Sequence, residues 1–218
     1  ASRMILAVGI TGNTENLGLE ATKIKVDRGH IVTDQWGATG EAGIYAIGDV
    51  TGPPWLAHKA SHEGIICVEK IMGQKDVHAI GDGAVPGCTY CRPQVASIGM
   101  TEAAAREAYG DDVRVVTSSF DEIDRARTER RTDGFLKVVV GRKGRILGAG
   151  MVGPQAGELI QPWILAISQK MKIGAVAQMI VPYPTRGEIN KRAAGSYYTP
   201  SLFSDRTRKI VRLLAKFG

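Results

Sequence analysis

The feature that most constrains the fold is a change of pattern at a glycine-rich stretch, GDGAVPG, at residues 81–87. Glycine and proline interrupt helices and strands, so we interpret this stretch as a linker. Before the linker, short apolar runs lie between turns and precede one helix. After it, the pattern is that of an antiparallel α+β unit. The chain is therefore expected to fold as two units.

The residues after the linker predict strands and helices joined by local turns. Lys143-Gly144 lies between two apolar runs and indicates a β-hairpin. Thr101 is expected to cap a helix that ends near Tyr109. Pro162 must kink its helix or lie near the first turn. Strands are predicted at residues 95–100, 113–120 and on both sides of the hairpin turn, and helices at residues 158–170, 174–179 and 185–194.

The residues before the linker predict a smaller and less complete set of elements. MILAVGI, at residues 4–10, has the composition of a buried strand. Such a strand needs neighbours on both sides, and nothing before it supplies them, so we expect a fragment of a longer chain. A helix is predicted at residues 55–72 with Gly73 as its C-cap. Further strands are predicted at residues 24–26, 31–32 and 44–47, and the apolar face of the helix is expected to contain Ile65, Ile66, Val68, Ile71 and Met72.

The net charge of +6 is concentrated near the C-terminal end. Residues 186–218 hold eight Lys or Arg and two Asp or Glu, whereas the rest of the chain carries 20 of each. Residues 1–185 have no net charge and give no reason to expect nucleic-acid binding. Only residues 186–218 carry an excess of positive charge, which favours an anionic partner. Residues 204–217 predict a basic amphipathic helix capped by Ser204. Its apolar face either contacts an anionic membrane surface or packs on a dimer.

Two further features bear on location. No apolar run reaches the roughly 18 residues of a membrane span, and the first residues lack the charge pattern and cleavage site of a signal peptide. The three cysteines, Cys67, Cys88 and Cys91, do not suggest a disulfide-stapled secreted fold. The cytoplasm is therefore the expected location.

The most informative stretch is GIYAIGDV, at residues 43–50. Gly48 would let a ligand approach the backbone, and Asp49 would project a carboxylate to which a sugar or polyol hydroxyl can donate. The free N–H groups and positive dipole end of the following helix, at residues 56–58, favour an anion or an electron-rich carbonyl. The alternative is an ordinary strand-ending turn in which Asp49 caps the next element.

Histidine and cysteine give weaker signals. His58 and His62 are spaced i, i+4 on a helix, but His30 and His78 are not placed to complete a metal site, so no metal is expected.

The C-x-x-C motif at residues 88–91 has no second pair to complete a zinc site. It also precedes a strand, whereas a thioredoxin-type pair opens a helix. We interpret Cys88 and Cys91 as structural thiols.

A rigid corner, VPYPTRGE, occupies residues 181–188. A proline lies on each side of Tyr183, Thr185 can cap a helix, and Glu188 lies one turn beyond Thr185. Glu188 is therefore expected to turn back toward the group that Tyr183 faces. Tyr183 and Glu188 are the candidate catalytic pair, and the alternative is that Tyr183 only packs at an interface.

Taken together, these motifs resemble the flavin-dependent pyridine nucleotide-disulfide oxidoreductases, with lipoamide dehydrogenases as the closest branch. TGEAGIYAIGDV followed by WLAHKASHEG is similar to the second FAD-binding motif of that family. PGCTYCRPQVASIGMTE is similar to the start of its interface domain, and ILAVGITGNTENLGLE to the end of its NAD-binding domain. The resemblance covers nearly the whole chain up to Ala194.

The resemblance implies FAD and NAD, or NADP, as cofactors. Asp49 would accept a hydrogen bond from the FAD ribityl chain, and Gly48 would let the cofactor approach. The backbone of Leu56, Ala57 and His58 would lie against the N1/C2=O edge of the flavin. Gly9 would lie near NAD.

The resemblance also implies a homodimer that acts on a small-molecule disulfide or another electron acceptor. The glycine-rich ADP loop and the C-x4-C redox disulfide of the family are missing here. We therefore expect these 218 residues alone to lack disulfide reductase activity.

The corner departs from the family pattern. The family has His-Pro-Thr-x-x-Glu, in which the histidine exchanges a proton with the thiol and the glutamate orients it. Here Tyr183 replaces the histidine and Glu188 is kept. A phenol, with an unperturbed pKa of about 10, is a poor base near neutral pH.

A tyrosine near this position and the C-terminal end resemble the mercuric reductase branch, but the vicinal cysteines of that enzyme are absent. Three possibilities therefore stay open: a lipoamide dehydrogenase type of enzyme, a mercuric-reductase-like flavin oxidoreductase without disulfide chemistry, and a stand-alone dimerisation module.

The predicted fold is an α/β fragment of an FAD/NAD(P)-binding Rossmann-like domain followed by an α+β interface (dimerisation) domain. Residues 1–22 would end the NAD-binding domain and residues 23–85 would form the C-terminal segment of the FAD-binding domain. Residues 86–195 would form the interface domain, and residues 196–218 the basic tail.

Overall fold

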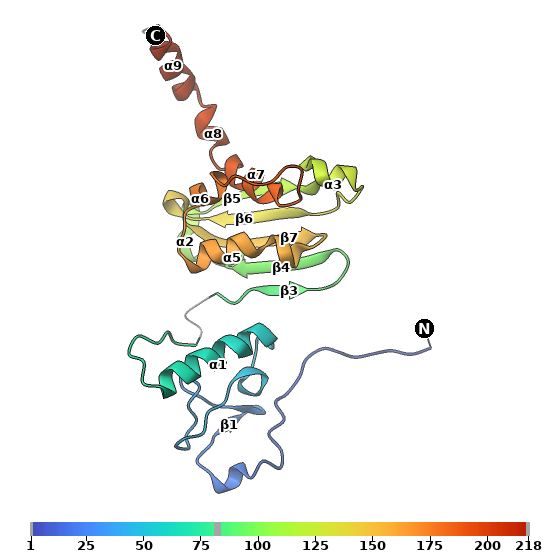
Figure 1. Cartoon of the computed structure of the whole chain (residues 1–218), viewed down its shortest axis with the longest axis vertical. Helices are drawn as coiled ribbons and strands as arrows, with labels where there is room; N and C mark the ends of the chain where they lie inside the picture. The colour runs from blue at the N-terminus through green and yellow to red at the C-terminus, as the bar shows by residue number, and fades with distance from the viewer. Residues whose placement is uncertain (1, 81–83, 217–218) are drawn as a thin grey trace. The chain divides into compact units, whose positions relative to one another are not determined.

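The computed structural model describes residues 2–80 and 84–216 and divides into two compact units (Figure 1). The N-terminal unit is Ala1–Gly83 and the C-terminal unit is Ala84–Gly218. The division falls inside the predicted linker, of which residues 81–83 lie outside the described residues. The four-part domain assignment stays a prediction.

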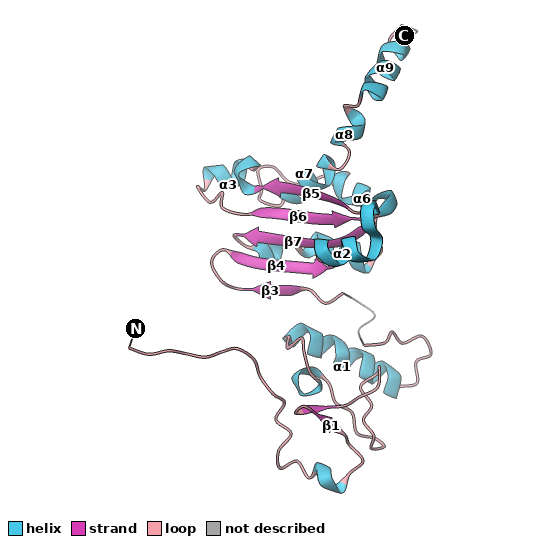
Figure 2. Ribbon diagram, turned by 180° about the vertical axis from the view of Figure 1, so that it is seen from behind, coloured by secondary structure: helices cyan, strands magenta, loops and turns pink. Residues whose placement is uncertain are grey.

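The described part of the C-terminal unit is built on an antiparallel sheet of five strands in the order β3-β4-β7-β6-β5 (Figure 2). The strands predicted on both sides of the hairpin are present, and Val140 pairs with Ile146 across it. Lys143 and Gly144 in the turn have φ values of 57° and 80°. Glycine adopts such positive φ values without strain, which accounts for its presence in the turn. The strands are β3 (Gly87–Thr89), β4 (Gln94–Gly99), β5 (Arg114–Ser119), β6 (Phe135–Val140) and β7 (Ile146–Gly153).

Helices cover both faces of this sheet. α5 packs on β7 and α7 packs on β5 and β6, whereas α2 is seen on the opposite face (Figures 1 and 2). The main core on the first face includes Trp163, Phe120 and Leu136, all fully buried. The helices are α2 (Glu102–Tyr109), α3 (Asp124–Thr128), α4 (Ala156–Leu159), α5 (Gln161–Ser168), α6 (Ile173–Ala177) and α7 (Glu188–Ser196).

The predicted local helix signals are present in this unit. The Thr101 hydroxyl accepts a hydrogen bond from the Ala104 N–H at 3.2 Å, which is an N-cap. Pro162 lies in the first turn of α5, where a backbone N–H would have no partner within the helix. The single helix predicted at residues 158–170 is therefore divided into α4 and α5. The predicted helix at residues 185–194 begins later, at Glu188.

The N-terminal unit is thinner. Its described elements are two 3-10 turns (Leu19–Ala21 and Gly48–Thr51), the antiparallel pair β1 (Val26–Asp27) and β2 (His30–Ile31), and the helix α1 (Ala57–Ile71). Gly73, with a φ of 78°, follows α1 as predicted for a C-cap.

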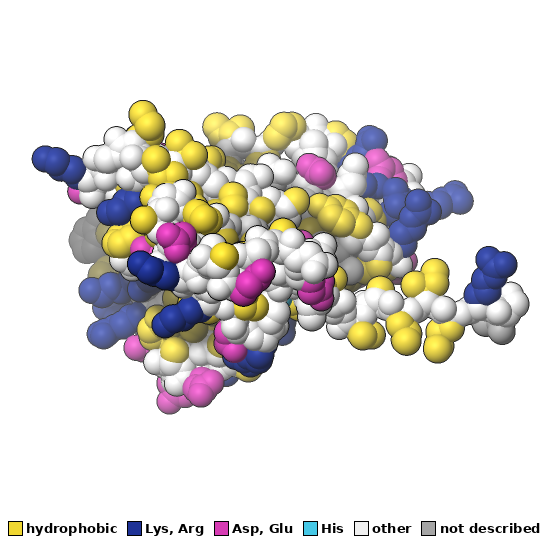
Figure 3. Space-filling view, turned by 90° about the horizontal axis from the view of Figure 1, so that it is seen from below, with side chains coloured by type: hydrophobic (Ala, Val, Ile, Leu, Met, Phe, Trp, Pro, Cys, Tyr) yellow, Lys and Arg dark blue, Asp and Glu magenta, His cyan; other side chains and the backbone are white. Residues whose placement is uncertain are grey.

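Three expectations for this unit are wrong. Residues 4–10 form no strand, and the exposed fractions of Met4, Leu6 and Val8 are 82%, 75% and 93%. Apolar side chains line this projecting N-terminal segment (Figure 3). No described strand lies beside it to satisfy its backbone groups, and a strand exists only by such pairing. Residues 44–47 form only an isolated bridge, between Ala38 and Tyr45, for the same reason.

The third wrong expectation concerns the predicted apolar face of α1. Ile66 is buried together with Cys67, but Ile65, Val68, Ile71 and Met72 are between 52% and 76% exposed. The described residues of this unit offer too little apolar surface to cover a face of that width.

The C-terminal end forms α8 (Thr199–Leu202) and α9 (Asp205–Leu214). The Ser204 hydroxyl accepts from the Thr207 N–H at 3.2 Å, so the predicted cap is present. No described residue from Thr199 onward is buried. Among the described residues, no helix combines the length and the apolar composition needed to cross a bilayer.

Candidate functional site

The first candidate site is the Gly48 turn, which we define as residues 48–58. Ile47 is extended, with a φ of −139°, and the chain then enters the 3-10 turn at Gly48, where φ is 74°. A side chain at Gly48 would be strained by that φ, and its Cβ would lie only 3.0 Å from the Cβ of Ala60. Glycine therefore lets the turn lie directly against α1.

A buried glutamate fixes the Gly48 turn to α1. The Gly48 N–H donates to Glu63 Oε2 at 2.7 Å, and Lys59 Nζ lies 2.7 Å from Glu63 Oε1. The exposed fractions of the Lys59 and Glu63 side chains are 13% and 4%. A buried charge is tolerated only when it is paired and hydrogen-bonded, as it is here. Sequence reasoning did not single out Lys59 or Glu63, although their i, i+4 spacing on a helix is a visible signal.

The outward side of the turn carries an exposed carboxylate, and the start of α1 follows it a few residues later. Asp49 is exposed, and within the described residues its carboxylate makes no hydrogen bond or ion pair. The Asp49 side chain does not cap α1, because no side chain accepts a hydrogen bond at the start of that helix. The alternative in which Asp49 only caps the next helix is therefore not observed. Leu56 is half-buried, and Ala57 and His58 are exposed at the start of the helix. A carboxylate acceptor and the positive end of a 15-residue helix thus lie on the same short segment.

These groups fit the part of FAD that the sequence resemblance assigns to them. The Asp49 carboxylate can accept from a polyol hydroxyl, and the uncapped start of α1 can stabilise negative charge on a ring carbonyl. The spacing G-x-G-x-x-G occurs in the sequence only at residues 148–153, which lie inside β7 and form no loop to hold the diphosphate, so the fit concerns this part of the cofactor alone.

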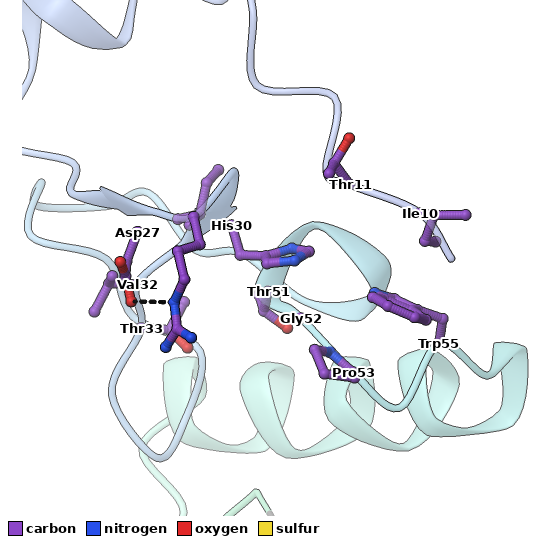
Figure 4. Close-up of a pocket in the computed structure, with 12 residues that line it drawn as sticks. Ile10, Thr11, Asp27, His30, Val32, Thr33, Thr51, Gly52, Pro53 and Trp55 are labelled. Carbon is purple, nitrogen blue, oxygen red and sulfur yellow. Dashed lines mark ion pairs between the residues drawn. The ribbon is translucent and has the colours of Figure 1, made fainter. Parts of the chain in front are cut away.

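A groove of about 650 Å³ lies beside the turn and was not predicted (Figure 4). Its lining includes Thr51, Gly52, His30 and Trp55, and the rings of His30 and Trp55 lie 6.3 Å apart between centroids. His30 Nδ1 is buried, and no hydrogen-bond partner for it is found among the described residues. Gly9, the predicted NAD-side residue, is exposed and adjoins Ile10, which lines the groove.

The second candidate site is the Tyr183 corner, which we define as residues 182–188. The Tyr183-Pro184 peptide is cis, and the Tyr183 ring is 70% exposed. The Tyr183 hydroxyl donates to Asp124 Oδ2 at 3.0 Å. This hydrogen bond, followed by the negative charges of Asp124 and then Glu188, raises the pKa of Tyr183 above its ordinary value.

Glu188 has a different partner from the expected one. Its Oε2 accepts from the Thr185 N–H at 3.1 Å, so it closes the turn that leads into α7 rather than bonding to the Tyr183 hydroxyl. Thr185 does not use its side chain as the expected helix cap, because its hydroxyl donates to the Pro182 carbonyl at 2.8 Å. The two candidate catalytic residues therefore lie on one corner without a direct hydrogen bond between them.

Arg186 anchors the corner and was missed by sequence reasoning. Its Nη1 donates to Gln155 Oε1 at 2.8 Å, and its Nη2 donates to Glu129, which also accepts from Arg125. The Arg186 side chain is 9% exposed. Burial, with a smaller effect of the nearby Arg125 charge, lowers the pKa of the Arg186 guanidinium. Its partners lie 31 and 57 residues away, so no local pattern could have indicated them.

The thiols show no sign of joint chemistry. Cys67, Cys88 and Cys91 are all free, and burial raises the pKa of the Cys67 thiol. Cys88 packs against the main core, whereas the Cys91 thiol is exposed and donates to the Pro93 carbonyl at 3.1 Å. In the part of the chain that the structure describes, no group of three or more His, Cys, Asp or Glu could hold a metal ion.

Comparison with known proteins covers both units. Residues 85–194 match the family model described as "Pyridine nucleotide-disulphide oxidoreductase, dimerisation domain", and residues 1–64 match "Pyridine nucleotide-disulphide oxidoreductase". Dihydrolipoyl dehydrogenase of Rhizobium etli is 51% identical over 199 residues, which are 91% of this chain and 41% of that protein. Dihydrolipoyl dehydrogenase of Zymomonas mobilis is 43% identical over 86% of this chain and 40% of its own.

Solved structures give the same picture. LpdA from Mycobacterium tuberculosis matches 86% of this chain and 41% of its own, with a TM-score of 0.79 and 29% identity. The HOCl-induced flavoprotein disulfide reductase RclA from Escherichia coli matches 87% of this chain and 44% of its own, with a TM-score of 0.81 and 29% identity. The predicted fold class is thus confirmed, and the chain spans about two fifths of the length of these relatives. By these matches the chain is a member of the pyridine nucleotide-disulphide oxidoreductase family.

Proposed function

We propose that the chain is the C-terminal portion of an FAD-dependent, NAD(P)-linked oxidoreductase of the dihydrolipoyl dehydrogenase type. The observation that carries the proposal is the match to dihydrolipoyl dehydrogenases over 91% of the chain, which includes both the Gly48 turn and the dimerisation domain. In this proposal the N-terminal unit supplies one segment of the FAD site. The C-terminal unit supplies the contact of a homodimer.

The Gly48 turn would hold the middle of the cofactor. Bound FAD would supply the transfer of electrons between NAD(P) and the acceptor. Asp49 would accept a hydrogen bond from a ribityl hydroxyl, and the backbone at Leu56, Ala57 and His58 would face the N1/C2=O edge of the ring. The bond from the Gly48 N–H to Glu63 supports this role, because it fixes the direction in which Asp49 projects. Gly9 would lie beside NAD.

The Tyr183 corner would face the electron acceptor, a small disulfide or another small molecule. With its pKa raised above about 10, Tyr183 stays protonated at neutral pH, so its hydroxyl keeps donating to Asp124 and cannot take a proton from a thiol. Glu188 would act by closing the corner that presents Tyr183.

The protonated Tyr183 also supports a second candidate, a mercuric-reductase-like flavin oxidoreductase without thiol acid/base chemistry. A third candidate, a dimerisation module without flavin, differs from both because it would be colourless.

The first experiment is a chimera. The part of the Rhizobium etli dihydrolipoyl dehydrogenase that precedes the matched region is joined to the first residue of this chain. We expect a yellow dimer that retains FAD through gel filtration. Asp49→Ala should weaken FAD binding about 10- to 100-fold, the effect of losing a charged hydrogen bond. Asp76→Ala, an exposed carboxylate of the same unit, is the matched control and should have no effect. A colourless chimera that still dimerises would overturn the flavin proposal and favour the dimerisation module.

The second experiment separates the two flavin candidates. In the same chimera, Tyr183→His restores a group that titrates near neutral pH, and it should raise NAD reduction by dihydrolipoamide, which is oxidised to lipoamide, about 100-fold or more. The pH–rate profile should gain a step near the ordinary histidine pKa of about 6.5. Unchanged lipoamide activity and an unchanged profile would assign residue 183 a structural role and favour the second candidate.

A further inference from the structure

The C-terminal helix α9 has the composition of a membrane-surface helix. It runs for ten residues, Asp205–Leu214, and Ser204 is its N-cap. The Thr207 hydroxyl also donates to the Ser201 carbonyl at 2.7 Å, which ties the start of α9 to the end of α8. The helix therefore has a defined beginning, and its faces can be assigned from the helical period.

The two faces of α9 are opposite in character. Around the helical period, Arg208, Lys209 and Arg212 gather on one side, whereas Arg206 in the first turn falls between Leu213 and Ile210. The apolar side chains lie on the other side, and all of them are exposed: Ile210 47%, Val211 58%, Leu213 56% and Leu214 64%. Just before the helix, Leu202 and Phe203 are 59% and 67% exposed. An apolar face that the described chain leaves uncovered requires an apolar environment.

We propose that α9, with the end of α8, is a docking surface for an anionic lipid bilayer, on which the helix lies in the plane of the membrane interface. Such helices combine a basic face, a face of Leu, Ile and Phe, and low overall hydrophobicity. The lipid headgroups would pair with the basic face and the acyl region would cover the apolar face. The inference is independent of the proposed flavin function, since it uses none of the residues of the Gly48 turn or the Tyr183 corner.

Other partners fit this surface less well. Nucleic acid would satisfy Arg208, Lys209 and Arg212 but offers no cover for Leu213 and Leu214. A second copy of α9 would form a coiled coil through a narrow seam, whereas the apolar arc here is wide and the helix has fewer than three turns. A bilayer matches both the width of the apolar arc and the opposite basic face.

The test is co-sedimentation of the purified chain with vesicles. The vesicles are phosphatidylcholine alone or phosphatidylcholine with about a quarter of phosphatidylglycerol. We expect binding to the anionic vesicles only, and weaker binding when NaCl rises from about 0.1 M to about 0.5 M. The triple variant Arg208→Gln, Lys209→Gln and Arg212→Gln should reduce the partition coefficient on the order of 100-fold.

A matched charge control and an apolar variant complete the test. Arg142→Gln, Lys170→Gln and Lys191→Gln remove the same charge from exposed positions outside the tail and should leave binding within about 3-fold. Leu213→Ala with Leu214→Ala keeps helix propensity but removes apolar area, and it should weaken binding at least about 10-fold.

Four results would overturn the proposal. They are no vesicle binding, equal binding to neutral vesicles, an equal loss of binding in the matched charge control, and a change of oligomeric state on deletion of residues 204–218 without vesicle binding. The last result would assign the apolar face to a second copy of the chain.

Discussion

The Gly48 turn and the Tyr183 corner differ in which of their polar groups are already bonded to protein. In the turn, Glu63 is buried and paired, while Asp49 faces outward with no partner among the described residues. In the corner, Tyr183 and Glu188 both have hydrogen-bond partners. The turn thus presents groups to a ligand, whereas the corner is closed on itself.

Both regions nevertheless share one structural feature, a charged anchoring side chain. Each is fixed to the rest of its unit by a charged side chain that is mostly buried, Glu63 in the turn and Arg186 in the corner. The anchoring residues are expected to control local stability, and the outward residues to control ligand binding. Substitution of the two anchors tests this division.

The largest effect is expected for Glu63→Ala. The change leaves the Gly48 N–H without its acceptor and Lys59 nearly buried without its partner, which costs about 3–5 kcal/mol of local stability. Amide hydrogen exchange in α1 should accelerate about 100- to 1,000-fold, while β4 in the C-terminal unit should exchange as before. Unchanged exchange in α1 would mean that Glu63 does not fix the turn.

Glu63→Gln separates the hydrogen bond from the charge. Its amide oxygen can still accept from the Gly48 N–H, but Lys59 loses its ion pair. Exchange in α1 should lie between that of the wild type and that of Glu63→Ala. If the glutamine variant were as unstable as the alanine variant, the ion pair alone would account for the anchor.

A smaller effect is expected for Arg186→Ala in the corner. The substitution removes the bonds to Gln155 and Glu129, but Glu129 is partly exposed and keeps Arg125, so the cost is about 1–3 kcal/mol. Exchange in α7 should accelerate about 10-fold. The control is Arg192→Ala on the same helix, because its pair with Glu122 is exposed on both sides and contributes about 0–1 kcal/mol. Equal effects of the two variants would contradict an anchoring role for Arg186.

The sequence predicted best those features that depend on neighbours along the chain. The hairpin at Lys143-Gly144 and the caps at Thr101 and Ser204 follow from turn and cap chemistry over a few residues, and all are present. The segment that links Gly48 to the start of α1 was likewise found from its glycine and its carboxylate.

The features that were missed depend on contacts between distant residues. β3 has only three residues, which are too few to show the alternating pattern of a strand in the sequence. It forms because it pairs with β4, for example Cys88 with Ala96. Glu63 was missed because its acceptor role needs Gly48, 15 residues away. Glu188 was predicted to turn back, and it does, but it accepts from the Thr185 N–H, while the Tyr183 hydroxyl donates to Asp124. Side-chain partners at a corner are set by atomic distances that residue spacing does not determine.

The smallest effect is expected for the titration of Tyr183, which tests how closed the corner is. Because the folded-state pKa of Tyr183 is raised, the stability that its bond to Asp124 contributes is complete below the ordinary pKa of about 10. That contribution is lost as pH rises through the higher folded-state pKa. The difference in phenolate absorbance between the wild type and Tyr183→Phe should therefore have its midpoint above pH 10.

Asp124→Asn is the control for that titration. The carboxamide can still accept from the Tyr183 hydroxyl, but it carries no negative charge and can donate to the phenolate. The midpoint should therefore move down toward the ordinary value, and the substitution should leave the exchange of α1 in the other unit unchanged. A midpoint at or below about 10 in the wild type would mean that Tyr183 is not held by Asp124 in solution. The corner would then present a free phenol, and its contrast with the Gly48 turn would disappear.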